Sequence, residues 1–156
     1  MIILGIDPGD TRVGFGVVQK DGVGLSLVES GCMHIPSAQH TVPQKLATIE
    51  RELLALIHKH RPDVAAVEEI FFAKNVKTGI RVAQARGVIL ATCEKSGVRI
   101  LEFTPSQIKQ AVCGYGKADK KQVQRMIQTI FNIKERPSQD DAADAVAAAL
   151  CASSSV

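Results

Sequence analysis

Two long helical patterns, each followed by a short apolar run, constrain the fold of this chain most strongly. Residues 42–60 carry apolar side chains at helical spacing and end before a proline, and an apolar run follows at 64–67. A second helical pattern at 76–96 precedes another apolar run at 98–103. Because a helical crossover carries the chain back across a sheet, the strands that it joins should lie parallel. We therefore expect an α/β fold.

The residues before the first helical pattern predict an antiparallel meander. Residues 2–6 form a short apolar run that ends before a proline and a glycine, as expected of a buried strand and a tight loop. Residues 14–19 and 23–34 have strand composition, with Asp21-Gly22 as the hairpin turn between them. With the two later strands, they predict a five-stranded mixed sheet of three antiparallel strands followed by two parallel ones, flanked by helices.

The last third of the chain is predicted to be helical. Helices are expected at 105–112, 120–131 and 140–152, and Asp119 is the expected N-cap of the second. The side chains expected to bury that helix are Val123, Met126, Ile127 and Ile130. Because no repeat, linker or low-complexity segment interrupts the pattern, we expect one domain over residues 1–156.

The composition excludes several classes of protein. With 46% hydrophobic and 22% charged residues, the chain is close to globular averages and unlike a disordered tail protein. The opening MIILGIDPGD has no basic leader, and no apolar stretch approaches the ~20 residues of a membrane helix, so a cytoplasmic protein is expected. Without a C-x-x-C pair, reduced thiols are expected rather than zinc or disulfides at Cys32, Cys93, Cys113 and Cys151.

Positive charge is concentrated in one segment. The whole chain has a formal net charge of +3, but residues 109–136 hold seven basic side chains against two acidic ones. Such a segment can bind the phosphates of a nucleic acid, or it can be an ordinary solvated helix face, and charge alone does not separate the two. The basic side chains are Lys109, Lys117, Lys120, Lys121, Arg125, Lys134 and Arg136.

Acidic residues stand at the ends of two predicted strands and on the last predicted helix. Asp7 ends the first strand, and Glu68 follows the apolar VAAV of the fourth. In open α/β sheets such strand ends collect functional groups, and parallel pairing would bring these two carboxylates to one edge. Asp141 and Asp144 are three residues apart, so they share one helix face, and their alanine neighbours allow close packing on a sheet.

A cluster of carboxylates predicts a metal site. Clustered carboxylates repel one another and raise each other's pKa unless a cation lies among them. Because the candidate ligands are oxygen atoms alone, Mg²⁺ or Mn²⁺ is favoured over zinc. A pair of such ions ~3.5–4 Å apart can activate a water molecule and stabilise the leaving oxygen in displacement at phosphorus.

Each acid also has an ordinary structural explanation. Asp7 can be a turn former, Glu68 a solvated strand end, and Asp141 a partner of the positive end of a helix that Ser138 caps. The combination favours a metal site, because acids at two buried strand ends and a D-x-x-D on the last helix are jointly hard to obtain by chance.

Several blocks of the sequence resemble, in order, those of the RuvC family of Holliday junction endonucleases in the ribonuclease H-like superfamily. They are GIDPG with VGFGVV, VEEIFFAKN, QARGV, QIKQAVCGYGKADKKQVQ and DAADAVA, and together they span nearly the whole chain. The resemblance implies a magnesium-dependent endodeoxyribonuclease, with Mn²⁺ as a substitute ion, that resolves four-way junctions in homologous recombination and DNA repair. It further implies paired nicks with 5′-phosphate and 3′-hydroxyl ends, a two-fold homodimer, and a branch-migration helicase complex of RuvA and RuvB as partner.

The resemblance also assigns roles to individual residues. Asp7, Glu68, Asp141 and Asp144 would hold two Mg²⁺ ions per subunit, and Lys120 would be a further catalytic residue. Phe71 would stack on an unpaired base, beside Lys74, and a stacked aromatic of this kind contributes roughly 1–3 kcal/mol. Lys109 and Lys120 match basic positions near the scissile phosphate. The other side chains expected to contact DNA are Lys117, Lys121 and Arg125.

Two features of the chain depart from the family pattern, and one predicted helix is a candidate for the dimer contact. Glu69 is a second acid where a neutral amide is expected, and strand alternation lets only one of Glu68 and Glu69 face the metal. The chain ends at Val156 without the basic tail of some members. The helix at 76–96, with Gly87 and several alanines, is our candidate for the dimer contact.

Two other functions fit parts of the sequence. The segment DPGDT resembles the phosphate loop of actin-like and sugar-kinase phosphotransferases, but such enzymes generally need two such domains, which 156 residues do not supply. A non-catalytic nucleic-acid-binding module on the same fold would tolerate loss of the acids, whereas all four are present. Metal-dependent hydrolysis of DNA is the better prediction.

Overall fold

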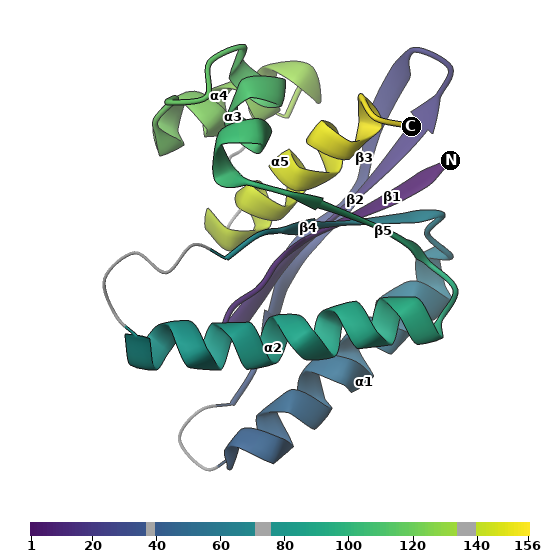
Figure 1. Cartoon of the computed structure of the whole chain (residues 1–156). Helices are drawn as coiled ribbons and strands as arrows, with labels where there is room; N and C mark the ends of the chain where they lie inside the picture. Colours follow the sequence, from purple (N-terminus) through teal and green to yellow (C-terminus); the bar gives the residue numbers. More distant parts are fainter. Residues whose placement is uncertain (37–39, 71–75, 134–139) are drawn as a thin grey trace.

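Ten helices and strands follow one another along the part of the chain that the structure, a computed structural model, describes (Figure 1). The described residues are 1–36, 40–70, 76–133 and 140–156. The elements are β1 (Ile2–Asp7), β2 (Arg12–Asp21), β3 (Gly24–His34), α1 (Val42–His60), β4 (Val64–Glu68), α2 (Val76–Lys95), β5 (Arg99–Phe103), α3 (Pro105–Cys113), α4 (Lys120–Ile130) and α5 (Asp140–Ser153). Their order confirms the predicted sequence of strands and helices.

The five strands form one mixed sheet in the order β3-β2-β1-β4-β5. The pairs β1–β2 and β2–β3 are antiparallel, whereas β1–β4 and β4–β5 are parallel, which confirms the predicted pairing. The hairpin turn lies one residue later than predicted, because Asp21 pairs with Gly24 and leaves Gly22 and Val23 in the loop. Gly22 has φ +59°, a backbone conformation that suits glycine at a tight hairpin.

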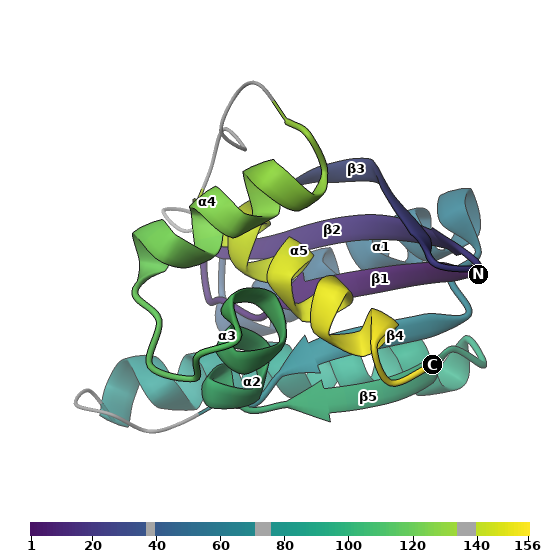
Figure 2. The same ribbon diagram turned by 90° about the horizontal axis from the view of Figure 1, so that it is seen from above.

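Helices cover both faces of the sheet, so the core has two layers. On one face α5 lies across the central strands, and α3 and α4 lie beside it (Figures 1 and 2). Alanines of α5 are buried there together with Ile108 of α3 and Ile127 of α4. On the other face, Ile49 and Leu53 of α1 and Ile89 of α2 pack against apolar side chains of β1 and β2.

Glycines in β1 and β2 let α5 approach the sheet closely. A Cβ atom at Gly5 would lie 1.9 Å from the carbonyl oxygen of Ala145, and one at Gly14 would lie 2.0 Å from that of Asp141. A Cβ atom at a third glycine, Gly16, would lie 2.5 Å from a methyl carbon of Val146. The bare backbone of the strands therefore receives the backbone of the helix, and the N-terminal turn of α5 is held at the end of the sheet.

The remaining sequence expectations have mixed outcomes. Asp119 caps α4 as predicted, because its carboxylate accepts a 2.9 Å hydrogen bond from the backbone N–H of Gln122. In α4, Val123 and Ile127 are buried, but Met126 and Ile130 are 37% and 36% exposed, so the predicted buried stripe was too wide. The cysteines are free thiols. Among the described residues, no helix is both long and apolar enough to cross a membrane.

Candidate active site

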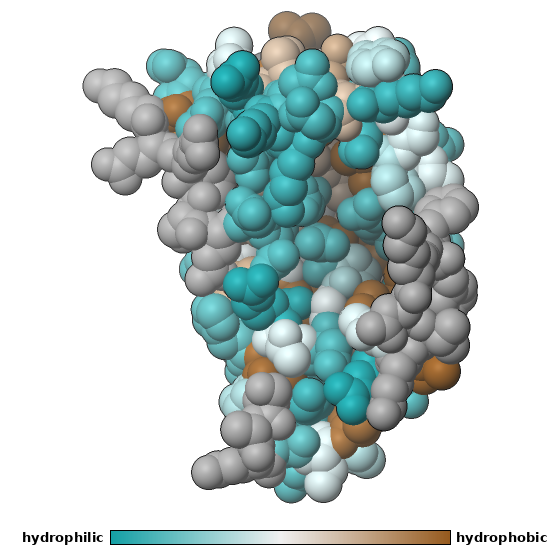
Figure 3. All heavy atoms as spheres, turned by 90° about the vertical axis from the view of Figure 1, so that its left-hand side faces the viewer, coloured by the Kyte–Doolittle hydropathy of each residue, from teal (hydrophilic) through white to brown (hydrophobic). Residues whose placement is uncertain are grey.

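Asp7 and Glu68 lie at the same end of two neighbouring parallel strands. The last hydrogen-bonded pair between β1 and β4 is Ile6 with Val67, and the next residue on each strand is the acid. Asp7 is two residues after Gly5, which faces α5, and Glu68 is two residues after Ala66, which is buried on the α5 side. Strand alternation therefore directs both carboxylates toward the layer that contains α5. The surface at this end of the molecule is mostly hydrophilic (Figure 3).

The first turns of α5 bring two more carboxylates to this end of the sheet. Asp141 pairs with Arg12 at the start of β2, with 3.0 Å between Oδ2 and Nε, and accepts a 3.6 Å hydrogen bond from the Cys32 thiol. Asp144 accepts a 3.1 Å hydrogen bond from the ammonium group of Lys120. The close approach at Gly14 fixes this placement, because that glycine lies against the backbone of Asp141 itself.

The electrostatic environment of the carboxylates is unfavourable to their charge. Burial, followed by the charges of Glu68, Asp144 and Asp141, raises the pKa of Asp7 to about 8. Burial also raises the pKa of Glu68, and the charge of Asp144 adds to this. The pKa of Asp144 is raised by burial as well, although its hydrogen bond with Lys120 acts in the opposite direction. The four acids therefore lie close enough for their charges to interact.

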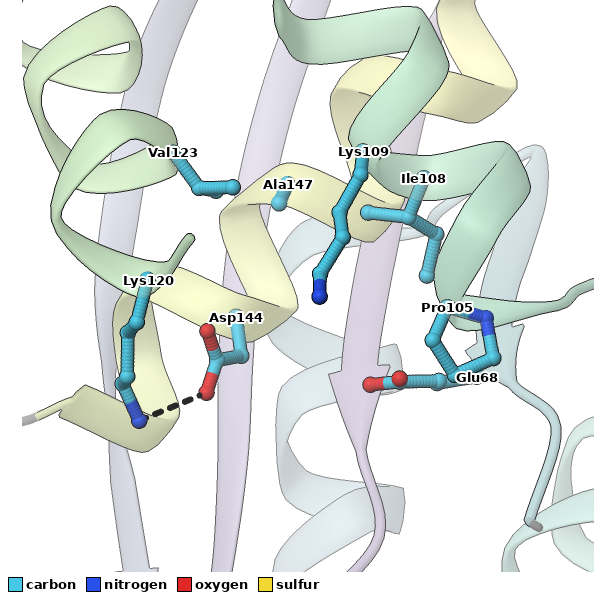
Figure 4. A pocket seen from close by; sticks show the side chains of 8 residues that line it. All are labelled: Glu68, Pro105, Ile108, Lys109, Lys120, Val123, Asp144 and Ala147. Atoms are coloured by element: carbon cyan, nitrogen blue, oxygen red, sulfur yellow. Dashed lines mark hydrogen bonds and ion pairs between the residues drawn. The ribbon is translucent and has the colours of Figure 1, made fainter. Parts of the chain in front are cut away.

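A single pocket joins one strand end with three helices (Figure 4). We call it the carboxylate pocket, and it is lined by Glu68, Pro105, Ile108, Lys109, Lys120, Val123, Asp144 and Ala147. Figure 4 shows the carboxylate of Glu68 and the ammonium group of Lys109 pointing into the space in front of Asp144. Lys109 of α3 and Lys120 of α4 thus line the same pocket as Glu68 and Asp144.

The two neighbouring glutamates point to different sides of the sheet. Glu68 lines the carboxylate pocket, whereas Glu69 lines a separate hollow with Ala83 and Arg86 of α2 and Glu102 of β5. Strand alternation accounts for this difference, because consecutive side chains leave a strand on opposite faces. Of the two acids, only Glu68 shares a pocket with Asp144.

The donor set fits a hard divalent cation. It consists of carboxylate oxygen atoms, and their mutual repulsion with burial raises the pKa of Asp7, a cost that a cation among them would remove. In the described part of the chain, however, no three His, Cys, Asp or Glu side chains converge at metal-binding distances. Two of the acids instead form ion pairs with basic side chains, Asp141 with Arg12 and Asp144 with Lys120.

The other predicted DNA contacts lie outside the carboxylate pocket or outside the described residues. Lys117, Lys121 and Arg125 are exposed on α4 and the loop before it. Arg125 lines a shallow hollow with the exposed Tyr115 and Met126, among other residues. Phe71 and Lys74 fall in the segment 71–75, which is not among the described residues.

Sequence reasoning missed the basic side chains that hold the loop after Asp7 and the N-terminus of α5. Arg12 pairs with Asp141, and Asp10 pairs with Lys45 of α1 at 3.6 Å and with Arg81 of α2 at 3.5 Å. Lys45 carried a usable signal, because it lies four residues before Ile49 on the apolar face of α1, where a lysine needs a partner. Arg12 and Arg81 carried none.

This mixed sheet with helices on both faces is a ribonuclease H-like fold. Acids lie at the ends of its parallel strands β1 and β4. The family model described as "Crossover junction endodeoxyribonuclease RuvC" matches residues 3–152, and the chain belongs to this family. It is therefore an endonuclease that resolves Holliday junctions, and family membership implies use of a divalent metal.

Named relatives and solved structures agree with this assignment. The crossover junction endodeoxyribonuclease RuvC of Petrotoga mobilis is 47% identical over 151 residues, which cover 97% of this chain and 92% of the relative. The structure of Thermus thermophilus RuvC matches with a TM-score of 0.87 at 34% identity, over 97% of this chain and 92% of that one. The Thermus protein in complex with a Holliday junction substrate matches with a TM-score of 0.86 at 32% identity, with the same coverage of both chains.

Proposed function

We propose that Asp7, Glu68, Asp141 and Asp144 hold a pair of Mg²⁺ ions with which this endonuclease hydrolyses DNA phosphodiesters, and that Mn²⁺ can replace them. The observation that carries the proposal is the convergence of acids from two parallel strand ends and α5 at one end of the sheet, where burial and three neighbouring acids raise the pKa of Asp7 to about 8. A protein gains nothing in stability from such a cluster, so its presence is best explained by a cation that binds it.

The side chains of this site have distinct tasks in the proposed reaction. When bound, the two ions would supply an activated water molecule and stabilise the leaving 3′ oxygen, which leaves 5′-phosphate and 3′-hydroxyl ends. Asp141 and Asp144 would exchange Arg12 and Lys120 for the ions. Lys120, released from Asp144, and Lys109 across the pocket would neutralise charge that develops on the scissile phosphate.

The DNA would lie across the hydrophilic end of the molecule. The exposed Lys117, Lys121 and Arg125 would contact the phosphate backbone, and such contacts position DNA without reading its sequence. Phe71 and Lys74 stay in the proposal as the base-stacking aromatic and its basic neighbour. Support for four-way junction DNA as the ligand comes from the 32% identical Thermus protein, which is solved with that substrate.

Symmetry and partners complete the proposal. A two-fold homodimer presents two equivalent sites, which suits a junction with two-fold symmetry and explains paired nicks. We place this dimer in the cytoplasm, with a RuvA and RuvB branch-migration complex as partner.

The test is a cleavage assay on a synthetic four-way junction with Mg²⁺, with Mn²⁺ and with a chelator. We expect symmetric nicks in either metal, none with the chelator, and none on linear duplex of the same sequence. Equal cutting of the linear duplex would contradict junction selectivity, and cutting in the chelator would contradict the metal mechanism.

A further inference from the structure

Arg86 of α2 reaches the end of β4 from the face of the sheet opposite to α5. Its Nε donates a 3.2 Å hydrogen bond to the carbonyl oxygen of Glu68. Its Nη2 donates to, and forms an ion pair with, the carboxylate of Glu102 on β5. The Arg86 side chain is only 19% exposed. One guanidinium group thus ties the residue that ends β4 to the neighbouring strand.

The carbonyl group of Glu68 needs such a partner because the sheet is ending there. The last pair between β1 and β4 is Ile6 with Val67, one residue earlier. On the other side, the backbone N–H of Glu69 still donates a 2.8 Å hydrogen bond to the carbonyl oxygen of Phe103. A strand end of this kind frays unless a side chain satisfies its polar groups.

The side chain and the carbonyl group of Glu68 are held in different layers. The carboxylate faces the carboxylate pocket with Asp144, while the carbonyl oxygen is bound by Arg86 from the α2 layer. The carbonyl carbon and Cβ of Glu68 are both bonded to its Cα atom, so a shift of this strand end would carry the side chain with it. The contact from α2 therefore bears on where this carboxylate points.

We infer that Arg86 is a positioning residue that fixes the Glu68 carboxylate in metal-binding orientation by holding its backbone. The inference rests on the proposed role of Glu68 as a metal ligand. It assigns a part in the chemistry to α2, none of whose described side chains lines the carboxylate pocket. Groups that orient a metal ligand without touching the metal typically affect affinity by about 10–100-fold.

An ordinary surface ion pair does not explain the geometry equally well. Glu102 is 43% exposed, and an exposed carboxylate contributes little to stability through a salt bridge. Arginine has a planar fork that serves two acceptors at fixed angles, whereas a lysine is a single point charge. Lysine at this position would keep the charge, but its donors all lie on one nitrogen atom and cannot reproduce the separated donors of the guanidinium group.

The first experiment measures Mn²⁺ affinity by electron paramagnetic resonance of the free ion, without DNA. We expect Arg86→Ala to weaken binding by about tenfold, and Arg86→Lys to fall between this variant and the wild type. Lys95→Ala is the control, because it removes a basic side chain from the same helix, at an ion pair with Glu50 of α1 in which Lys95 is 75% exposed. Circular dichroism melting establishes that each variant is folded.

A double-mutant cycle with Glu68→Gln separates positioning from general loosening of the fold. If Arg86 acts through Glu68, adding Arg86→Ala to Glu68→Gln should not weaken Mn²⁺ binding further. Additive losses would overturn the inference, as would an Arg86→Ala variant with wild-type affinity. If Glu68→Gln itself binds Mn²⁺ like the wild type, the proposed function fails instead.

Junction cleavage supplies an independent readout. With saturating Mg²⁺, Arg86→Ala should lower kcat and leave the affinity for the junction unchanged, since Arg86 lies on the other face of the sheet from the basic helices. A loss of junction affinity with unchanged kcat would assign Arg86 to DNA binding and contradict the inference.

Discussion

At the level of single residues, Asp7 has a surrounding that opposes its negative charge, although the proposed metal site requires that charge. Its carboxylate ends a strand whose preceding residue, Ile6, is fully buried, and its pKa is raised to about 8. Asn has nearly the same shape as Asp but no negative charge. We expect Asp7→Asn to bind four-way junctions with unchanged affinity, because the basic surface stays, and to lose cleavage by at least about 100-fold. Gel-shift and cleavage assays on one junction measure both. Nicking at the wild-type rate in Mg²⁺ would remove Asp7 from the metal site.

Lys120 makes a second residue-level prediction. Burial acts to lower its pKa, but the hydrogen bond and charge of Asp144 outweigh this and raise it, so the side chain is a permanent cation beside the acids. Lys120→Ala should slow cleavage and reduce the salt slope of junction binding by about one phosphate contact. Lys121→Ala is the control, since this neighbour is exposed and lies outside the carboxylate pocket: it should change the slope at most, and the cleavage step little. An unchanged slope for Lys120→Ala would exclude a phosphate contact.

Sequence reasoning was strongest for residues whose position follows from strand geometry. The parallel strand ends put Asp7 and Glu68 side by side, as predicted, because an apolar run ending in an acid marks the edge of a buried sheet. Side-chain pairing was not predictable in the same way. Arg12, Lys45 and Arg86 reach their partners across the fold, and no local pattern in the sequence encodes a contact between distant segments.

At the level of elements, the position of α5 depends on three glycines in β1 and β2. A methyl group at Gly14 would lie 2.0 Å from the carbonyl oxygen of Asp141, an overlap that only a shift of the helix can relieve. We expect Gly14→Ala to cost about 1–3 kcal/mol of unfolding free energy, as for other overpacked sites. The cleavage rate of the protein that remains folded should also fall, because Asp141 would shift with the helix. Urea unfolding and junction cleavage measure the two effects.

Gly87→Ala is the control for this substitution. Nothing lies within 4 Å of a Cβ at Gly87, which is exposed on α2, so alanine should raise helix stability by up to about 1 kcal/mol. A Gly14→Ala variant with wild-type stability and cleavage would show that α5 does not depend on this contact.

Helix boundaries were predicted well, and strand boundaries and burial less well, for a physical reason. Helical periodicity and capping residues are local, so α1 was predicted at its observed bounds and Asp119 at its observed role. How much of a helix is buried depends on its neighbours. α4 has α3 and α5 on one side only, which leaves Met126 and Ile130 at the surface despite their apolar character.

At the level of the whole molecule, two layers with different tasks meet at one end of the sheet. The helices on the α5 side carry Asp141, Asp144 and the lysines, while side chains of α1 and α2 bind the end of β4 or the loop after β1 from the other face: Lys45, Arg81 and Arg86. This division explains why the family blocks of the sequence are spread over almost the whole chain. The proposed metal site therefore has contacts with both layers.

Without metal, the acidic cluster should make the whole protein less stable as the pH rises, whereas the stabilisation by bound metal should grow with pH. Asp7, Glu68 and Asp144 all have a raised pKa in the folded protein, the first at about 8, whereas unfolded carboxyl groups titrate near pH 4. Between these values the folded state binds more protons, so without metal the unfolding free energy should fall as the pH rises from about 5 to 8. Glu29, whose pKa is lowered by its hydrogen bond with Lys59, is ionised in both states across this window and does not oppose the trend.

Mg²⁺ should reverse this trend, because only deprotonated carboxylates bind it and its stabilisation therefore grows with pH. At a concentration of about 100 times Kd, the ion adds about 2.7 kcal/mol. Urea unfolding with Mg²⁺ and with a chelator, at about pH 5 and about pH 8, gives the four unfolding free energies that test both trends. Asp7→Asn should flatten the metal-free dependence and reduce the gain from Mg²⁺. If the wild type were equally stable at both pH values without metal, the four acids would not form one coupled site, and the assignment of the metal ligands would have to be abandoned.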